Sequence, residues 1–245
     1  MIDMIFEGFR YHKHLPNFYK IENPQNPKRE ITGDLLDDLL NLAKKYDFTG
    51  ISYSKLSDDF KSEFNTDIDN VIIFKFLMGE DILKMEPSKE KGKLMDSEFQ
   101  EYGFHVYEFA DFLRKNGFKA DIIHPLDDNL SLRAIAMHSN DCVITRSNMC
   151  FFKDGLHNSF FMIHTSIDNL PVKEKNDMLW VKDFCSTCGV CIERCPENAF
   201  DEEENFLRKA CTAHREGCSE CILKCPFYKR GYDKVKKRYG RMVKK

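Results

Sequence analysis

Hydrophobic residues in the first 175 positions follow two spacings, one typical of helices and one typical of strands. After Thr32, which is placed to cap a helix, leucines from Leu35 to Leu42 recur on one helical face and predict a helix that ends near Lys45. The stretch VIIFKFLM, residues 71–78, is apolar and rich in β-branched and aromatic residues, so it predicts the strongest strand. A second, long amphipathic helix is predicted after Ser97, with Gly117 placed to end it.

Weaker patterns fill the rest of this region. They predict a short helix over residues 131–138 and a solvated, charged loop over residues 81–93. Further strands are predicted over residues 48–54, 118–125, 141–145 and 160–166. Strands that alternate with helices indicate an α/β or α+β layer up to about Lys175.

Composition and charge exclude several classes of protein. The chain is 42% hydrophobic and 31% charged, which is ordinary for a packed globular protein. No apolar run approaches the roughly 18 residues of a membrane helix, so no membrane association is predicted. The first sixteen residues carry acids and histidines where a secretory signal needs a basic start and an apolar stretch. We therefore expect a cytoplasmic location.

The cysteines are concentrated in one region. Eight of the ten lie between positions 185 and 225, and in a reducing compartment such clustering favours metal ligation over disulfides. The first run, C-x2-C-x2-C-x3-C-P, consists of Cys185, Cys188, Cys191 and Cys195 followed by Pro196. The second run consists of Cys211 and, seven positions later, a C-x2-C-x3-C-P pattern made by Cys218, Cys221 and Cys225 before Pro226.

This spacing is typical of ferredoxins with two [4Fe–4S] clusters, in which the fourth cysteine of each run ligates the other cluster. Applied here, the first cluster takes Cys185, Cys188, Cys191 and Cys225. The second cluster takes Cys195, Cys211, Cys218 and Cys221. A structural zinc site is the alternative, because C-x2-C pairs also bind zinc, but zinc ribbons do not require C-x2-C-x2-C-x3-C-P. Two neighbouring clusters would conduct single electrons.

The C-terminal residues 229–245 are strongly basic, with nine Lys or Arg residues against one acid, Asp233. The simplest interpretation is a frayed, solvated helix. The alternative is a contact for an acidic protein partner or for an RNA backbone.

The second cysteine run, followed by CPF, resembles the C-terminal ferredoxin module of epoxyqueuosine reductases and cobalamin-dependent reductive dehalogenases. The helix that ends in LRKNGFKA and the segment from Leu132 to Val172 resemble the same families, and Asn148 matches an asparagine of their corrinoid-binding segment. The resemblance implies an α+β protein with a nitroreductase-like α/β domain over residues 1–175 and a bacterial-ferredoxin-like module over residues 176–228, before a basic tail over residues 229–245. In those families the upstream domain seats a corrinoid over the nearer cluster.

The chain departs from the family pattern where the corrinoid approaches closely. Met137, Ser139, Arg146 and Met149, or their neighbours, stand where the families have glycines, and a side chain at such a position displaces the ligand. These departures favour a relative without cobalamin, although a corrinoid bound near Asn148 stays open. The sequence predicts a redox protein that passes low-potential electrons to a cofactor or to a partner's metal centre. The alternative is a non-catalytic subunit for assembly or activation of a larger metalloenzyme.

Other chemistry-bearing residues have simpler interpretations. Cys142 and Cys150 are expected to be core thiols rather than a redox or metal site. His105, His124 and His164 lie on or beside apolar elements, where core or capping histidines are more frequent than ligands. Glu80 and Asp81 are expected to be solvated carboxylates after a strand rather than an acid–base pair.

Overall fold

The computed structural model describes residues 18–123 and 131–243 of the chain, and these form two compact units built from alternating segments. The first unit comprises residues up to Phe76, Phe99–Asn140 and Ser159–Lys175. The second comprises Leu77–Glu98, Asp141–Asn158 and Asn176–Lys245. The chain thus returns from the first unit to the second between Lys175 and Asn176, the point at which the cysteine module was predicted to begin.

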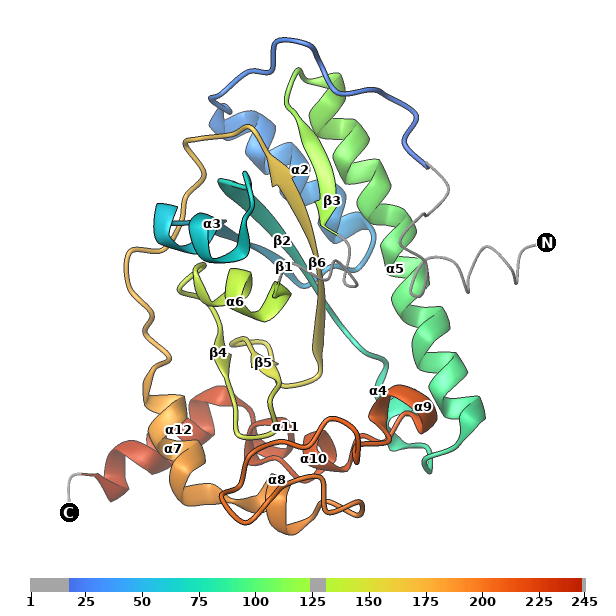
Figure 1. The fold of residues 1–245 in the computed structure, drawn as a ribbon, viewed down its shortest axis with the longest axis vertical. Helices are drawn as coiled ribbons and strands as arrows, with labels where there is room; N and C mark the ends of the chain where they lie inside the picture. The colour runs from blue at the N-terminus through green and yellow to red at the C-terminus, as the bar shows by residue number, and fades with distance from the viewer. Residues whose placement is uncertain (1–17, 124–130, 244–245) are drawn as a thin grey trace. The chain divides into compact units, whose positions relative to one another are not determined.

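The first unit is built on a four-stranded sheet with the order β1-β2-β6-β3 (Figure 1). Its strands are β1 (Gly50–Lys55), β2 (Asn70–Leu77), β3 (Ala120–Ile123) and β6 (Asn158–Thr165). Strands β1 and β2 are antiparallel, with Ile51 opposite Phe74, and β3 and β6 are antiparallel, with Ile122 opposite Ile163. Strand β2 is buried along nearly its whole length, as its apolar sequence predicts.

Helices cover both faces of this sheet (Figure 1). Helix α2 (Gly33–Lys45) begins at Thr32, whose hydroxyl accepts a hydrogen bond from the Leu35 amide as the sequence predicts. On the face shared with α5 (Lys89–Lys115), the ring of Phe109 stacks on Phe74 at 4.6 Å between centroids. On the opposite face, the Ser54 hydroxyl donates to the Ile135 carbonyl of α6 (Leu132–Met137) at 2.8 Å. The sheet is therefore the middle layer of an α+β unit.

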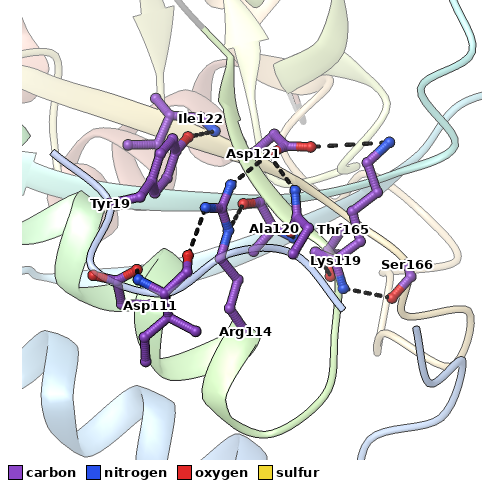
Figure 2. A network of polar contacts seen from close by, with 11 residues as sticks. Tyr19, Asp111, Arg114, Lys119, Ala120, Asp121, Ile122, Thr165 and Ser166 are labelled. Carbon is purple, nitrogen blue, oxygen red and sulfur yellow. Dashed lines mark hydrogen bonds and ion pairs between the residues drawn. The ribbon is translucent and has the colours of Figure 1, made fainter. Parts of the chain in front are cut away.

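A buried arginine joins the end of α5 to β3 and to the chain that precedes α2 (Figure 2). Arg114 is 8% exposed and donates hydrogen bonds to the carbonyls of Ala120 and Ile21, each at 2.8 Å. It also forms an ion pair with Asp121 at 2.6 Å, and its guanidinium lies 3.6 Å from the centre of the Tyr19 ring. The turn after α5 depends on Gly117, whose φ of +92° favours glycine.

The structure corrects several predicted boundaries. The stretch predicted as a solvated loop after β2 holds α4 (Glu80–Lys84) and the beginning of α5, which starts eight residues before Ser97. Its charges alternate at helical spacing, and the Glu80–Lys84 ion pair spans one turn. Helix α3 (Asp58–Phe64) and strand β5 (Cys150–Phe151) were not predicted, because both are too short to show a period. His124 and Pro125 lie outside the described residues.

The second unit consists mainly of short helices around the cysteine runs. They are α7 (Trp180–Cys188), α8 (Val190–Glu193), α9 (Ala213–Glu216), α10 (Glu220–Leu223), α11 (Pro226–Arg230) and α12 (Tyr232–Met242). A two-stranded sheet of β4 (Val143–Ile144) and β5 also belongs to this unit. Across the described ranges, no helix is both long and apolar enough to span a membrane.

Helix α12 corrects the prediction of a frayed, solvated C-terminal helix. Tyr232 and Val235 are only 8% and 3% exposed. The indole nitrogen of Trp180 donates to the Tyr232 hydroxyl at 3.0 Å, and the Trp180 ring stacks on Tyr239 at 5.5 Å. The apolar positions of this basic helix are thus anchored to α7.

Replacing Arg114 with Met tests the role of this arginine. We expect the free energy of unfolding to fall by about 3 kcal/mol, because two carbonyls and a carboxylate lose their donor. Lys119→Met is the matched control, since Lys119 contacts the same Asp121 at 3.9 Å but its side chain is 37% exposed, and we expect a loss of at most about 1 kcal/mol. Urea denaturation measures both, and equal losses would contradict this role for Arg114.

Candidate functional site

The first cysteine run is positioned by two consecutive short helices. Cys185 and Cys188 lie in the last turn of α7, and Cys191 lies in α8. Gly189 separates the helices with a φ of +63°, a conformation that few other residues adopt without strain. This left-handed turn redirects the chain between Cys188 and Cys191, and Cys195 follows directly after α8.

The second run repeats the same local design. Gly217, with a φ of +67°, ends α9, and Cys221 lies in α10. The run closes at Cys225, followed by Pro226 at the start of α11, where a missing amide hydrogen and a fixed φ suit a helix N-terminus. Both runs thus place a left-handed glycine beside C-x2-C and end in Cys-Pro.

Five thiols line one small cavity in the second unit. Cys185, Cys188 and Cys191 come from the first run, and Cys221 and Cys225 come from the second. The rest of its wall includes the apolar side chains of Leu156, Phe184, Val190 and Phe227 and the hydroxyl residues Thr145 and Ser147. The cavity thus holds the four residues assigned to the first cluster, together with Cys221, which was assigned to the second.

Electrostatic interactions connect the same four thiols. Burial raises the pKa of Cys185 to about 12, and the nearby thiols of Cys225, Cys191 and Cys188 add to the shift. Burial also raises the pKa of Cys225 to about 11, with further contributions from Cys188 and Cys191. Without bound iron the thiols of Cys185 and Cys225 are neutral near pH 7, so metal binding must displace their protons.

The remaining four thiols form a second neighbourhood. Burial raises the pKa of Cys218, and the thiols of Cys211 and Cys195 raise it further. The pKa of Cys221 rises to about 12 for the same reasons, with contributions from Cys218, Cys191, Cys211 and Cys195. Cys195 comes from the first run, so each neighbourhood contains one thiol from the opposite run. The influence of Cys191 on Cys221 shows that the two neighbourhoods are adjacent.

No disulfide joins any two of the ten cysteines. Within residues 18–123 and 131–243, no group of three or more His, Cys, Asp or Glu side chains converges closely enough to hold one metal ion. A multi-iron cluster needs wider spacing between its ligands than a single zinc ion does, and soft thiolates suit iron–sulfur clusters.

Arg146 and Met149 face the cysteine module. The Arg146 guanidinium donates to the carbonyls of Cys185 and Ser186 at 3.5 and 3.1 Å, and it forms an ion pair with Glu204. The sulfur of Met149 lies 4.0 Å from that of Cys221. Two of the residues that the sequence analysis matched to family glycines therefore have side chains in contact with this module.

Asn148 occupies the turn between β4 and β5. Its φ of +59° is left-handed, a conformation in which asparagine is enriched. Its backbone N–H donates a hydrogen bond to the Thr145 carbonyl at 2.9 Å. This geometry gives Asn148 a structural role in the hairpin. Binding of a cofactor by Asn148 stays a prediction.

The other sequence candidates do not form a further site. Cys142 and Cys150 are buried, and a hydrogen bond between the two thiols is the main cause of the raised pKa of Cys142. Glu80 and Asp81 are exposed, and Glu80 pairs with Lys84. His105 stacks on Tyr46 at 3.9 Å, and burial lowers the pKa of His164.

A buried lysine beside the second neighbourhood was missed by the sequence analysis. Lys91 is 1% exposed, and its ammonium donates to the carbonyls of Leu83 and Met85 and to the Ser219 hydroxyl, at 2.8, 2.6 and 2.8 Å. Burial lowers its pKa, and the neighbouring Cys218 opposes that shift. The stretch KEKGK carries no hydrophobic signal, so only the folded chain shows that this one lysine is enclosed.

Comparisons with known proteins agree with this geometry. Residues 178–201 match the 4Fe-4S binding domain family. The catabolic reductive dehalogenase NpRdhA in complex with 3-bromo-4-hydroxybenzoic acid is similar in structure, with a TM-score of 0.65 and 15% identity over 89% of this chain and 36% of that one. A second dehalogenase structure, described as suggesting a mechanism for B12-dependent dehalogenation, has a TM-score of 0.63 and 15% identity over 98% of this chain and 38% of that one.

Epoxyqueuosine reductase with a tRNA-Tyr epoxyqueuosine-modified stem loop is also similar, with a TM-score of 0.55 and 14% identity over 81% of this chain and 66% of that one. The chain shares the fold of these reductases. It spans about a third of the length of the dehalogenases and about two thirds of that of the epoxyqueuosine reductase. No curated protein matches its sequence. The chain thus contains a 4Fe-4S binding domain and shares its fold with these solved structures.

Paired cysteine replacements test which thiols share a cluster. Cys195→Ser alone is expected to leave about four of eight irons, because one cluster loses a ligand. Adding Cys218→Ser should remove little more iron, since both thiols are assigned to the second cluster. Adding Cys188→Ser instead should remove nearly all of it. Iron and sulfide analysis after anaerobic reconstitution gives the counts, and the reverse pattern would contradict the crossed assignment.

Proposed function

We propose that this chain is an iron–sulfur redox protein that passes single electrons through two neighbouring [4Fe–4S] clusters. The observation that supports the proposal is that thiols of both runs lie together: Cys225 lines one cavity with Cys185, Cys188 and Cys191, and Cys195 lies near Cys218 and Cys221. Cys185, Cys188, Cys191 and Cys225 would hold the first cluster. Cys195, Cys211, Cys218 and Cys221 would hold the second.

When bound, the clusters supply one-electron chemistry, and the chain sets the conditions for it. Apolar side chains such as Phe184 and Phe227 shield the first neighbourhood from water. The amide of Ala199 donates to the sulfur of Cys195 at 3.3 Å, and such hydrogen bonds stabilise the more negative, reduced state. The exposed Glu193 and the exposed acids between residues 201 and 204 disfavour the reduced state, an effect that contact with solvent weakens.

The residues present do not fit a corrinoid over the first cluster. Arg146 lies against the carbonyls of Cys185 and Ser186. By the sequence resemblance, it or a neighbouring residue matches a glycine of the related families. Removing it would break an ion pair with Glu204 as well as these hydrogen bonds. We therefore assign the far end of the electron path to the redox centre of a partner protein rather than to a bound corrinoid.

The accessory-subunit alternative rests on the same observation. A chain that keeps its clusters but fills the corrinoid position can serve the assembly or activation of a larger metalloenzyme. Stable co-purification with a metal-containing enzyme, without electron exchange with a soluble carrier, would favour that role.

Anaerobic reconstitution with iron and sulfide, followed by a titration with hydroxocobalamin, tests the proposal. We expect about eight irons per chain, reversible one-electron reduction, and no tight binding of the corrinoid. Visible and EPR spectra report on both the iron–sulfur clusters and the added hydroxocobalamin. Four irons or fewer would overturn the two-cluster assignment, and tight binding with reduction to Co(I) would overturn the exclusion of the corrinoid.

Lys91 provides a second test, directed at the second cluster. A buried cation near Cys218 stabilises the reduced cluster, so Lys91→Met and Lys91→Gln should lower the reduction potential of the second cluster more than that of the first. Ser219→Ala is the control, because it removes a hydrogen bond to Lys91 but keeps the charge. Spectroelectrochemical titration measures both potentials, and an equal shift in Ser219→Ala would exclude an effect of the charge.

A further inference from the structure

A basic groove of about 630 Å³ lies in the second unit, between the end of α7, the end of α8 and the helices α11 and α12. We call it the basic groove and define it by its charged side chains, which are Arg194, Lys224, Lys229, Arg230, Lys234 and Arg238. Glu193 is the one acidic residue in its lining. The groove therefore has a strong positive charge in a chain whose net charge is −3.

The cations of the groove are largely uncompensated. Lys224 pairs with Glu220 at 3.3 Å. Across the described ranges, the other five make no ion pair with an acidic side chain. Apolar side chains such as Val235 and the 60% exposed Met242 lie between them. A surface with free cations around apolar contacts suits a protein with acidic side chains, because charge gives attraction and the apolar part gives contact area.

The groove is held in place by packing. Helix α12 carries Lys234 and Arg238 on the groove side, while Tyr232 and Tyr239 contact Trp180 of α7. The backbone that carries Lys234 and Arg238 is therefore ordered before any partner binds, which lowers the entropic cost of association. A solvated tail with the same charges would lack this order.

One cluster ligand connects the groove to the redox site. Cys188 lines both the basic groove and the cavity that it shares with Cys185, Cys191 and Cys225. An occupant of the groove thus lies against a residue assigned to the first cluster. Binding of RNA would need only the cations of the groove, which contact phosphates. An electron carrier would also make use of the position of the groove beside a cluster ligand.

We propose that the basic groove is the docking site for an acidic electron-transfer protein that exchanges electrons with the cluster assigned to Cys185, Cys188, Cys191 and Cys225. This inference rests on the proposed redox function. In each encounter one electron passes from the reduced carrier to the cluster, so the carrier is oxidised by one electron, the cluster is reduced by one, and no bond changes. The cations offset the repulsion between the acidic carrier and the negative charge of the thiolate-bound cluster.

The test measures how fast a reduced plant-type [2Fe–2S] ferredoxin, an acidic carrier, reduces the reconstituted protein in anaerobic stopped flow. The groove variant is Lys234→Glu with Arg238→Glu. The control is Lys237→Glu with Arg241→Glu, which changes the same charge on the same helix outside the groove lining. We expect the second-order rate constant at low salt to fall about tenfold or more in the groove variant and less than about threefold in the control. The loss should shrink as salt is added.

Reduction by dithionite separates this inference from the proposed function. If dithionite reduces the clusters of both variants, the redox function stands, and equal rate constants with ferredoxin would overturn the docking site alone. If dithionite reduces neither cluster of the unaltered protein, the proposed function fails. A tRNA that binds more weakly to the groove variant while the ferredoxin rates stay unchanged would also overturn the inference, in favour of a nucleic-acid surface.

Discussion

The proposed exchange of Cys195 and Cys225 between two short runs is the constraint on which the cysteine module would depend. Each run is a pair of helical turns too short to be stable alone, and α8 and α10 have four residues each. Because Cys225 lies with the thiols of the first run and Cys195 with those of the second, neither neighbourhood is complete without the other. Binding of iron would therefore couple the folding of both runs, since metal-binding free energy becomes folding free energy.

Two cationic side chains lie beside the buried thiols of the two runs. Thiols that are buried enough to have a pKa of about 11 or 12 need partners that compensate their charge once iron is bound. Arg146 supplies a cation beside the first run, and Lys91 supplies one beside the second. Both side chains are fixed by backbone carbonyls, so the compensation is built into the fold.

Sequence patterns predicted the features of the fold that depend on residues close together in the chain. The Thr32 cap, the buried strand β2 and the end of α5 at Gly117 were all predicted, because each depends on residues within one or two turns. The start of α5 was missed because its first turns carry charges rather than an apolar face, and Lys91 in those turns is buried by Ser219, which is 128 positions away. The cysteine spacing predicted that Cys225 would lie with Cys185, Cys188 and Cys191, but the cavity that these thiols line also includes Cys221. The spacing held no information on Arg146, whose role depends on contacts with Cys185 and Glu204.

The iron-loaded protein offers the most direct test of the central claim, which is the crossed arrangement of eight thiols around two clusters. A crystal structure at the iron absorption edge would place the iron atoms by their anomalous density. The account predicts two four-iron peaks, with Cys225 bound to the cluster of Cys185, Cys188 and Cys191, and with Cys195 bound to the other. A single peak, or a cluster bound by all four cysteines of the first run, would contradict it.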